Sequence, residues 1–170
     1  MTQQRLFILI RAALTDIQSG ECHFSEMTVE EWGSLLAYCS NQGLVAVAFA
    51  GIERLHIKPP KAQLLYWFRF AEYVKDNYKR QWRGAKAFAR LIKEVDAEML
   101  VIKGLSLSKY YPNPAAREFG DLDVYTYDAH GRVNKLVESK SIRVDYWDKH
   151  DVFDYAGIHV EHHSYFVGRN

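Results

Sequence analysis

The sequence predicts an α+β protein in which a helical N-terminal half packs on a small mixed β-sheet. Apolar residues recur at helical spacing through most of residues 4–95, the pattern of amphipathic helices. After Glu98 this pattern gives way to short apolar and alternating runs, as expected for strands. With 170 residues, 48% of them hydrophobic, the chain can bury a core. We expect a helical region over residues 1–95 and an α/β core over residues 96–170, which together form one compact unit.

Start and stop signals divide the N-terminal half into helices. Thr28 is a typical N-cap residue, and Glu31 three positions later completes a capping box. The apolar stripe predicted for that helix consists of Trp32, Leu35, Leu36 and Cys39. Gly43 and the pair Pro59–Pro60 are stop signals. We expect helices over residues 4–17, from Thr28 to the stop at residues 41–43, over residues 44–55 and over residues 61–95.

The long helix predicted over residues 61–95 has an apolar and a basic side. Its apolar stripe consists of Leu64, Phe68, Ala71, Tyr78, Trp82, Ala85, Phe88 and Ile92. Its outward face carries Arg69, Lys79, Arg80, Arg83, Lys86 and Arg90. A solvated helix face is the simpler interpretation of these charges. The alternative is a basic surface that attracts a phosphate-bearing partner.

Strand patterns dominate the C-terminal half. Met99–Ile102 is a short apolar run, the form expected of a fully buried strand. Further strands are predicted over residues 118–125, 142–147, 151–155 and 158–166, and helices over residues 105–110 and 129–138. The last two strands turn at Ala156–Gly157.

Net charge, apolar runs and cysteine content indicate which partners and which cellular compartment to expect. The formal net charge is +1, from 22 basic and 21 acidic residues, so nucleic acid is not indicated as a partner. No apolar run is long enough for a transmembrane helix or a signal peptide. Cys22 and Cys39 fit no metal motif, and two buried thiols are favoured over a disulfide. We therefore expect a cytoplasmic protein without a membrane partner.

Two acidic residues lie on one face of a predicted strand. Asp121 and Asp123 are separated by Leu122, and strand side chains alternate, so both carboxylates point away from the core. Such a pair repels itself unless a cation lies between the two groups, and Mg²⁺ suits oxygen ligands. Two solvated acids at a strand end are the structural alternative.

Glu161 offers a third carboxylate. It lies in the predicted strand 158–166, where it shares one face with His159 and His163 while His162 takes the other. Three carboxylates could complete a two-metal site for an in-line displacement. Zinc held by His159, His162 and His163 is disfavoured, because adjacent strand positions face opposite ways.

Lys103 and Gly104 follow a predicted strand and precede a short helix. Glycine allows a ligand close to the backbone, helix N-termini bind phosphate, and Ser106 adds a hydroxyl. The simpler interpretation is an ordinary strand-to-helix turn.

These residues, taken in order, resemble a known family. Lys103–Gly104, residues 112–117, Gly120–Asp123, His150 and Glu161–His163 resemble the uncharacterised bacterial nucleotidyltransferase-like proteins of the DNA polymerase beta superfamily. The resemblance implies a minimal nucleotidyltransferase sheet flanked by helices. It also implies that Asp121, Asp123 and Glu161 are catalytic metal ligands, and that Lys103, Gly104, Ser106 and Arg117 contact the triphosphate.

The implied activity is transfer of a nucleoside monophosphate from a nucleoside triphosphate such as ATP to a hydroxyl of an unknown acceptor, with Mg²⁺ or Mn²⁺ as cofactor (an EC 2.7.7-like reaction). Relatives usually continue beyond the third carboxylate, so the family's C-terminal part is expected to be missing after Asn170.

One alternative is a degenerate or truncated relative that binds a nucleotide or a protein. Another is an Mn²⁺-dependent glycosyltransferase, disfavoured because only one strand precedes Asp121. A final strand can also leave an edge for a homo-oligomer.

Overall fold

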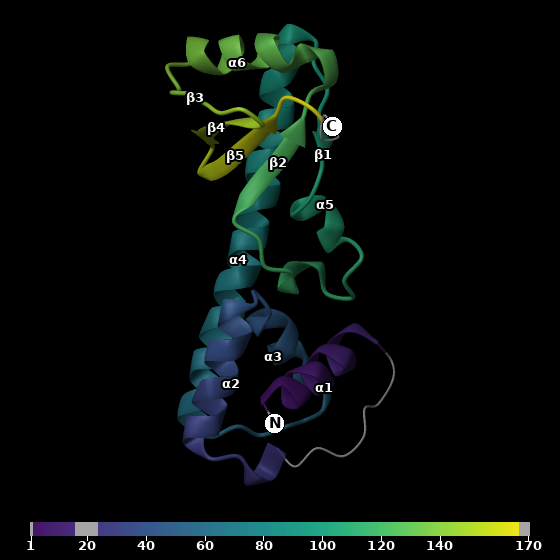
Figure 1. Ribbon diagram of the computed structural model, residues 1–170, viewed down its shortest axis with the longest axis vertical. Helices are drawn as coiled ribbons and strands as arrows, with labels where there is room; N and C mark the ends of the chain where they lie inside the picture. The colour runs from purple at the N-terminus through teal and green to yellow at the C-terminus, as the bar shows by residue number, and fades with distance from the viewer. Residues whose placement is uncertain (1, 16–23, 167–170) are drawn as a thin grey trace. The chain divides into compact units, whose positions relative to one another are not determined.

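The computed structural model describes residues 2–15 and 24–166 and has an α+β fold (Figure 1). The chain forms two compact units. The first, called here the helical unit, comprises Met1–Asp76 and Ser108–Glu118. The second, the sheet unit, comprises Asn77–Leu107 and Phe119–Asn170. The assignment of residues 1–95 and 96–170 to separate regions stays a prediction. None of the described helices is long and apolar enough to cross a membrane.

The helical unit follows the predicted start and stop signals closely. It contains α1 (Thr2–Leu14), η1 (Phe24–Glu26), α2 (Val29–Asn41), α3 (Val45–Arg54), η3 (Pro114–Ala116) and the first half of α4 (Lys61–Leu91). The capping box of α2 is present, since Thr28 Oγ1 accepts from the N–H of Glu31 and the Glu31 carboxylate accepts from the N–H of Thr28. The predicted helix end at Ile17, and Cys22, lie outside the described residues.

The core of the helical unit is aromatic and closely packed. Trp32 and Trp67 meet edge to face with ring centroids 6.3 Å apart, and both are almost fully buried. The Cys39 thiol is also buried, and burial raises its pKa to about 12. Helix α3 crosses α1 so closely that a Cβ on Gly51 would lie 2.2 Å from the carbonyl oxygen of Leu9. Only glycine allows that approach without a shift of the backbone.

The N-terminus of α3 is capped from far away in the sequence. Its N-cap residue, Leu44, supplies no side-chain hydrogen bond. The carboxylate of Glu118 instead accepts from the N–H groups of Val45 and Ala46, at 2.8 and 3.4 Å. These amides would otherwise lack partners, so Glu118 joins residues 108–118 to the helical unit. The strand predicted from residue 118 therefore begins only at Asp121.

The predicted stripe of α4 was partly wrong. Leu64, Phe68 and Trp82 are 39–47% exposed. The buried positions along the helix are Trp67, Ala71, Val74, Gln81, Gly84, Ala85, Phe88 and Leu91. The buried positions also recur at intervals of three and four residues. Spacing alone therefore did not distinguish this stripe from the predicted one. The predicted basic positions of the outward face are all exposed.

The sheet unit contains a mixed five-stranded sheet in the order β1-β2-β5-β4-β3. The strands are β1 (Leu100–Val101), β2 (Asp121–Tyr125), β3 (Asp145–Tyr146), β4 (His150–Tyr155) and β5 (Ile158–His163). Strands β2 and β5 are parallel, and the other pairs are antiparallel. The prediction of a fully buried first strand was wrong, because β1 is a short edge strand in which Leu100 is 38% exposed. Strand β3 is also shorter than predicted.

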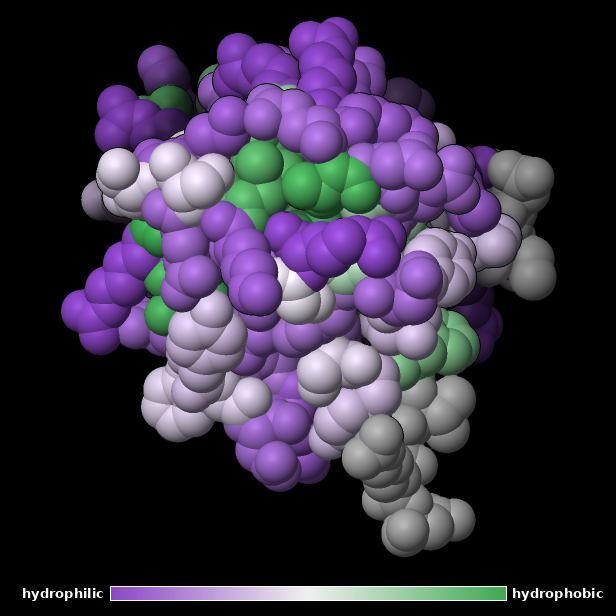
Figure 2. Space-filling model, turned by 90° about the horizontal axis from the view of Figure 1, so that it is seen from above, coloured by the Kyte–Doolittle hydropathy of each residue, from purple (hydrophilic) through white to green (hydrophobic). Residues whose placement is uncertain are grey.

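Helices cover one face of the sheet. The second half of α4, η2 (Ile92–Val95), η4 (Tyr127–Ala129) and α6 (His130–Ser139) belong to this unit, together with most of α5 (Leu105–Ser108). Phe88 of α4 and Val133 and Val137 of α6 share a buried core with Leu122 and Val160 of the sheet. The opposite side of α6 is polar, and the view from above is mainly hydrophilic with a small apolar area (Figure 2).

A buried polar chain crosses this core. Asn134 donates its amide hydrogen to Asp151 at 2.6 Å, so its oxygen is left to accept from Nδ1 of His162 at 2.7 Å. The other ring nitrogen of His162 then accepts from the Thr126 hydroxyl at 2.7 Å. Burial lowers the pKa of His162 from 6.5 to about 3, with a smaller effect from His130 and His163. His162 is therefore neutral and uses both nitrogens.

We expect Gly51→Ala to destabilise the protein. The added Cβ would collide with the backbone of Leu9, and overpacking of this kind costs about 1–3 kcal/mol. Gly33→Ala in α2 is the matched control, because its nearest neighbour would be Gln63 Nε2 at 3.8 Å. That control should gain up to about 1 kcal/mol from helix propensity. Urea unfolding followed by circular dichroism measures both changes, and equal stabilities would contradict the close crossing of α1 and α3.

We also expect His162→Phe to lower the free energy of unfolding by about 2–4 kcal/mol. An apolar ring in the same place leaves the buried Thr126 hydroxyl and the Asn134 carbonyl without their ring partner. His159→Phe is the control, because His159 is exposed on the opposite face and should change stability by about 0.5 kcal/mol or less. Chemical denaturation compares the two, and a His162→Phe variant as stable as the parent would refute this role.

Candidate functional site

The parallel pairing of β2 with β5 brings the predicted carboxylates together. Asp123 is paired with Glu161 and Asp121 with His159. Paired residues on neighbouring strands point to the same face, here the face opposite Leu122 and Val160. Carboxylate oxygens of Asp121, Asp123 and Glu161 all lie within 4.8 Å of one another. The three residues proposed as metal ligands from the sequence therefore form one group.

Asp123 is the buried member of this group, with 2% of its surface exposed. Its Oδ1 lies 2.7 Å from Lys103 Nζ and 3.0 Å from His163 Nε2. The hydrogen bond to Asp123 raises the pKa of Lys103 above 10.5, so the ammonium stays charged. A buried carboxylate needs such partners, and Lys103 provides one from outside the strand.

The carboxylate group fits a hard divalent cation. All three donors are carboxylate oxygens, the ligand type that Mg²⁺ and Mn²⁺ prefer. Asp121 and Glu161 are partly exposed, so the group combines a buried ligand with an approach for substrate. Among the described residues, the three carboxylates carry three formal negative charges, and the ammonium group of Lys103 offsets one of them. A divalent cation would balance the remainder.

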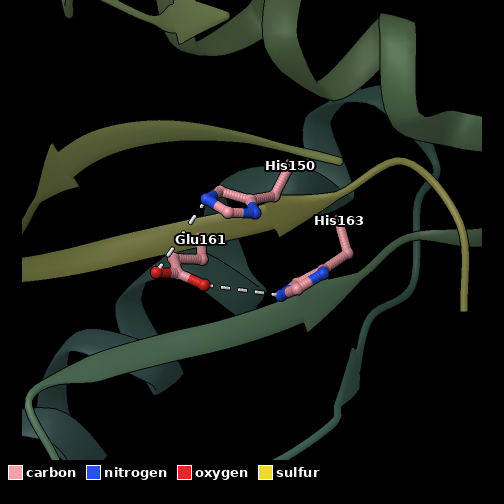
Figure 3. Close-up of side chains that lie close together, drawn as sticks. All are labelled: His150, Glu161 and His163. Atoms are coloured by element: carbon pink, nitrogen blue, oxygen red, sulfur yellow. Dashed lines mark ion pairs between the residues drawn. The ribbon is translucent and has the colours of Figure 1, made fainter. Parts of the chain in front are cut away.

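Two histidines extend the group along β5 and onto β4. His150 Nε2 lies 4.0 Å from Glu161 Oε1, and His163 Nε2 lies 3.7 Å from Glu161 Oε2. Figure 3 shows Glu161 between the two rings, with one oxygen toward each ring. Glu161 thus belongs to two candidate groups, one with the aspartates and one with the histidines.

The predicted phosphate-binding segment follows β1. The N–H of Ile102 donates to the backbone carbonyl of Asp123 at 3.0 Å. This bond places the next residue, Lys103, beside the side-chain carboxylate of Asp123. Gly104 has φ +43° and opens α5, a conformation that favours glycine. The Ser106 hydroxyl donates to the carbonyl of Lys103 at 3.0 Å. Helix α5 has four residues, and its dipole is correspondingly small.

Arg117 was also proposed as a phosphate contact. It belongs to the helical unit, where its N–H donates to the carbonyl of Pro114 at the end of η3. The structure groups the other predicted site residues within the sheet unit, and their roles, like that of Arg117, stay predictions.

Two α4 side chains that support the site were missed in the sequence. Asn77 donates to the carbonyl of Phe119 at 2.6 Å, and Gln81 donates to that of Gly120 at 2.8 Å. They hold the segment that leads directly into Asp121. Their spacing of four residues could have indicated them, because polar side chains one helical turn apart lie on the same face of a helix.

Comparison with known proteins identifies a family for most of the chain. Residues 28–170 match the model of a family described as uncharacterised nucleotidyltransferase. No curated protein and no solved structure matches the chain. The family match begins at the N-cap of α2 and includes every residue of the carboxylate group. The chain therefore belongs to the uncharacterised nucleotidyltransferase family.

Proposed function

We propose that this protein transfers a nucleoside monophosphate from a nucleoside triphosphate to a hydroxyl group of an acceptor, with Mg²⁺ as cofactor. The supporting observation is the convergence of Asp121, Asp123 and Glu161 on one face of a parallel strand pair, in a chain of a nucleotidyltransferase family. In the reaction a new bond forms between the acceptor oxygen and the α-phosphorus. The bond from that phosphorus to the pyrophosphate oxygen breaks.

The three carboxylates would hold the divalent cation, which, when bound, supplies positive charge for the phosphate oxygens. Glu161 is partly exposed and would take the proton of the acceptor hydroxyl, while Asp123 in its buried position orients the group. Lys103 is 55% exposed beyond its contact with Asp123, so its ammonium can turn toward a triphosphate. Gly104 and Ser106 would line the phosphates beside it. Catalysis would rest on positioning and charge.

The decisive experiment is calorimetric titration of ATP, GTP, CTP and UTP into the protein, with Mg²⁺ and with EDTA. We expect one or more nucleotides to bind only with Mg²⁺. Asp121→Asn and Asp123→Asn should each abolish that binding, because each removes a charged ligand. Asp154→Asn is the matched control, since Asp154 lies on β4, is exposed and pairs with His159. Binding that survives in EDTA or in both site variants would refute the proposal.

The same variants separate a binding role from a structural one. Asp121→Asn should leave the free energy of unfolding unchanged or slightly higher, because it relieves repulsion between like charges. Thermal unfolding without metal measures this effect. Marked destabilisation would instead show that the Asp121 carboxylate serves the fold.

Lys103→Ala should weaken triphosphate binding by about tenfold or more, since a charge-assisted hydrogen bond contributes about 1.5–3 kcal/mol. Its effect on Mg²⁺ affinity should be small or favourable, because the variant removes a cation that competes for Asp123. Lys135→Ala on the exposed side of α6 is the control. Nucleotide and Mg²⁺ titrations measure the two affinities, and equal losses of both would contradict the assignment of Lys103 to the phosphates.

A further inference from the structure

We propose that His150, Glu161 and His163 form a second cation site, which takes a zinc-like transition-metal ion and shares Glu161 with the carboxylate group. This site goes beyond the proposed nucleotidyl transfer and would exist without a nucleotide.

The register of the β4–β5 hairpin builds this group. His150 is paired directly with His163 across the two antiparallel strands. Glu161 precedes His163 by two positions, so it lies on the same face. The three side chains therefore come from adjacent positions on a rigid ladder. Sites built on strands are positioned more firmly than sites built on loops.

The distances suit an ion after small side-chain adjustments. The two imidazole Nε2 atoms lie 4.0 and 3.7 Å from different oxygens of Glu161, and the ligand atoms of all three residues lie within 4.8 Å of one another. A tetrahedral ion with ligands at about 2.0–2.1 Å separates those ligands by about 3.3 Å. Closure by about 1 Å lies within the range of small χ rotations. Figure 3 shows the rings turned toward the carboxylate.

The donor set distinguishes this site from the carboxylate group. Two imidazoles and one carboxylate form the ligand set of several catalytic zinc sites, and imidazole also suits cobalt and nickel. Mg²⁺ prefers oxygen ligands throughout. The side chains of His150, Glu161 and His163 are 31, 23 and 17% exposed, so solvent reaches each of them.

This histidine set differs from the zinc set of His159, His162 and His163 that the sequence disfavours. His162 points into the core and uses both ring nitrogens there. His159 contacts Asp154 at 2.9 Å. His150, which was not considered as a ligand, takes their place because hairpin pairing brings it opposite His163.

The two sites are coupled through His163 as well as Glu161. His163 Nε2 lies 3.0 Å from Asp123 Oδ1, and an ion bound at that nitrogen would replace this contact. The same atom cannot donate a hydrogen to Asp123 and a lone pair to a metal. Occupation of the histidine site would therefore free one side of Asp123 for the cation of the carboxylate group.

The test uses Co²⁺ as a spectroscopic probe on the full chain, without any affinity tag and without nucleotide. We expect one equivalent of Co²⁺ to produce visible absorption bands that Zn²⁺ then removes. His150→Ala should weaken Co²⁺ binding by about 100-fold or more, beyond the effect of losing an outer partner. His159→Ala, on the same face of β5, is the matched control and should bind as the parent does.

Circular dichroism confirms that each variant is folded before titration. The proposal is overturned if the parent shows no bands, if His150→Ala binds Co²⁺ like the parent, or if Asp121→Asn loses the bands while His150→Ala keeps them. That last pattern would place the ion among the carboxylates. Because the titration contains no nucleotide, each of these results leaves the Mg²⁺-dependent binding of nucleotides to be judged by its own experiment.

Discussion

The register between β2 and β5 is the constraint on which the candidate site depends. It places Asp123 beside Glu161 on one face and Leu122 beside Val160 on the other. A slip by one residue would turn a carboxylate into the core, because side chains alternate along a strand. Two features oppose that slip. Leu122 and Val160 share a buried core with residues of α4 and α6. Both ring nitrogens of His162 have hydrogen-bond partners, Thr126 and Asn134, in the observed register.

The two faces of the sheet have opposite energetic roles. The covered face buries apolar side chains and a fully bonded polar chain, which stabilise the unit. The opposite face holds three carboxylates whose oxygens lie within 4.8 Å of one another, and like charges at this separation repel unless a cation lies between them. Lys103 offsets part of this repulsion through Asp123.

Local patterns predicted much of this structure, and long-range contacts limited the rest. The capping box at Thr28 and the alternation around Glu161 follow from neighbouring residues, so both could be recognised in the sequence. The cap on α3 joins Glu118 to Val45, 73 positions away, so no pattern among neighbouring residues could predict it. His150 was recoverable in principle, because a hairpin turning at Ala156–Gly157 fixes its pairing with His163.

Glu161 lies where the two kinds of donor meet in the sheet. Strand β2 offers carboxylates, β4 offers the imidazole of His150, and β5 between them offers both kinds. Three carboxylates and the ammonium of Lys103 leave a formal charge of about −2, which one divalent cation balances. A second cation would leave an excess of about +2 at the surface, and repulsion would disfavour it unless an anion joined. A triphosphate supplies that anion. Two bound cations would therefore favour the binding of a nucleotide, and Glu161 is the residue that both candidate groups share.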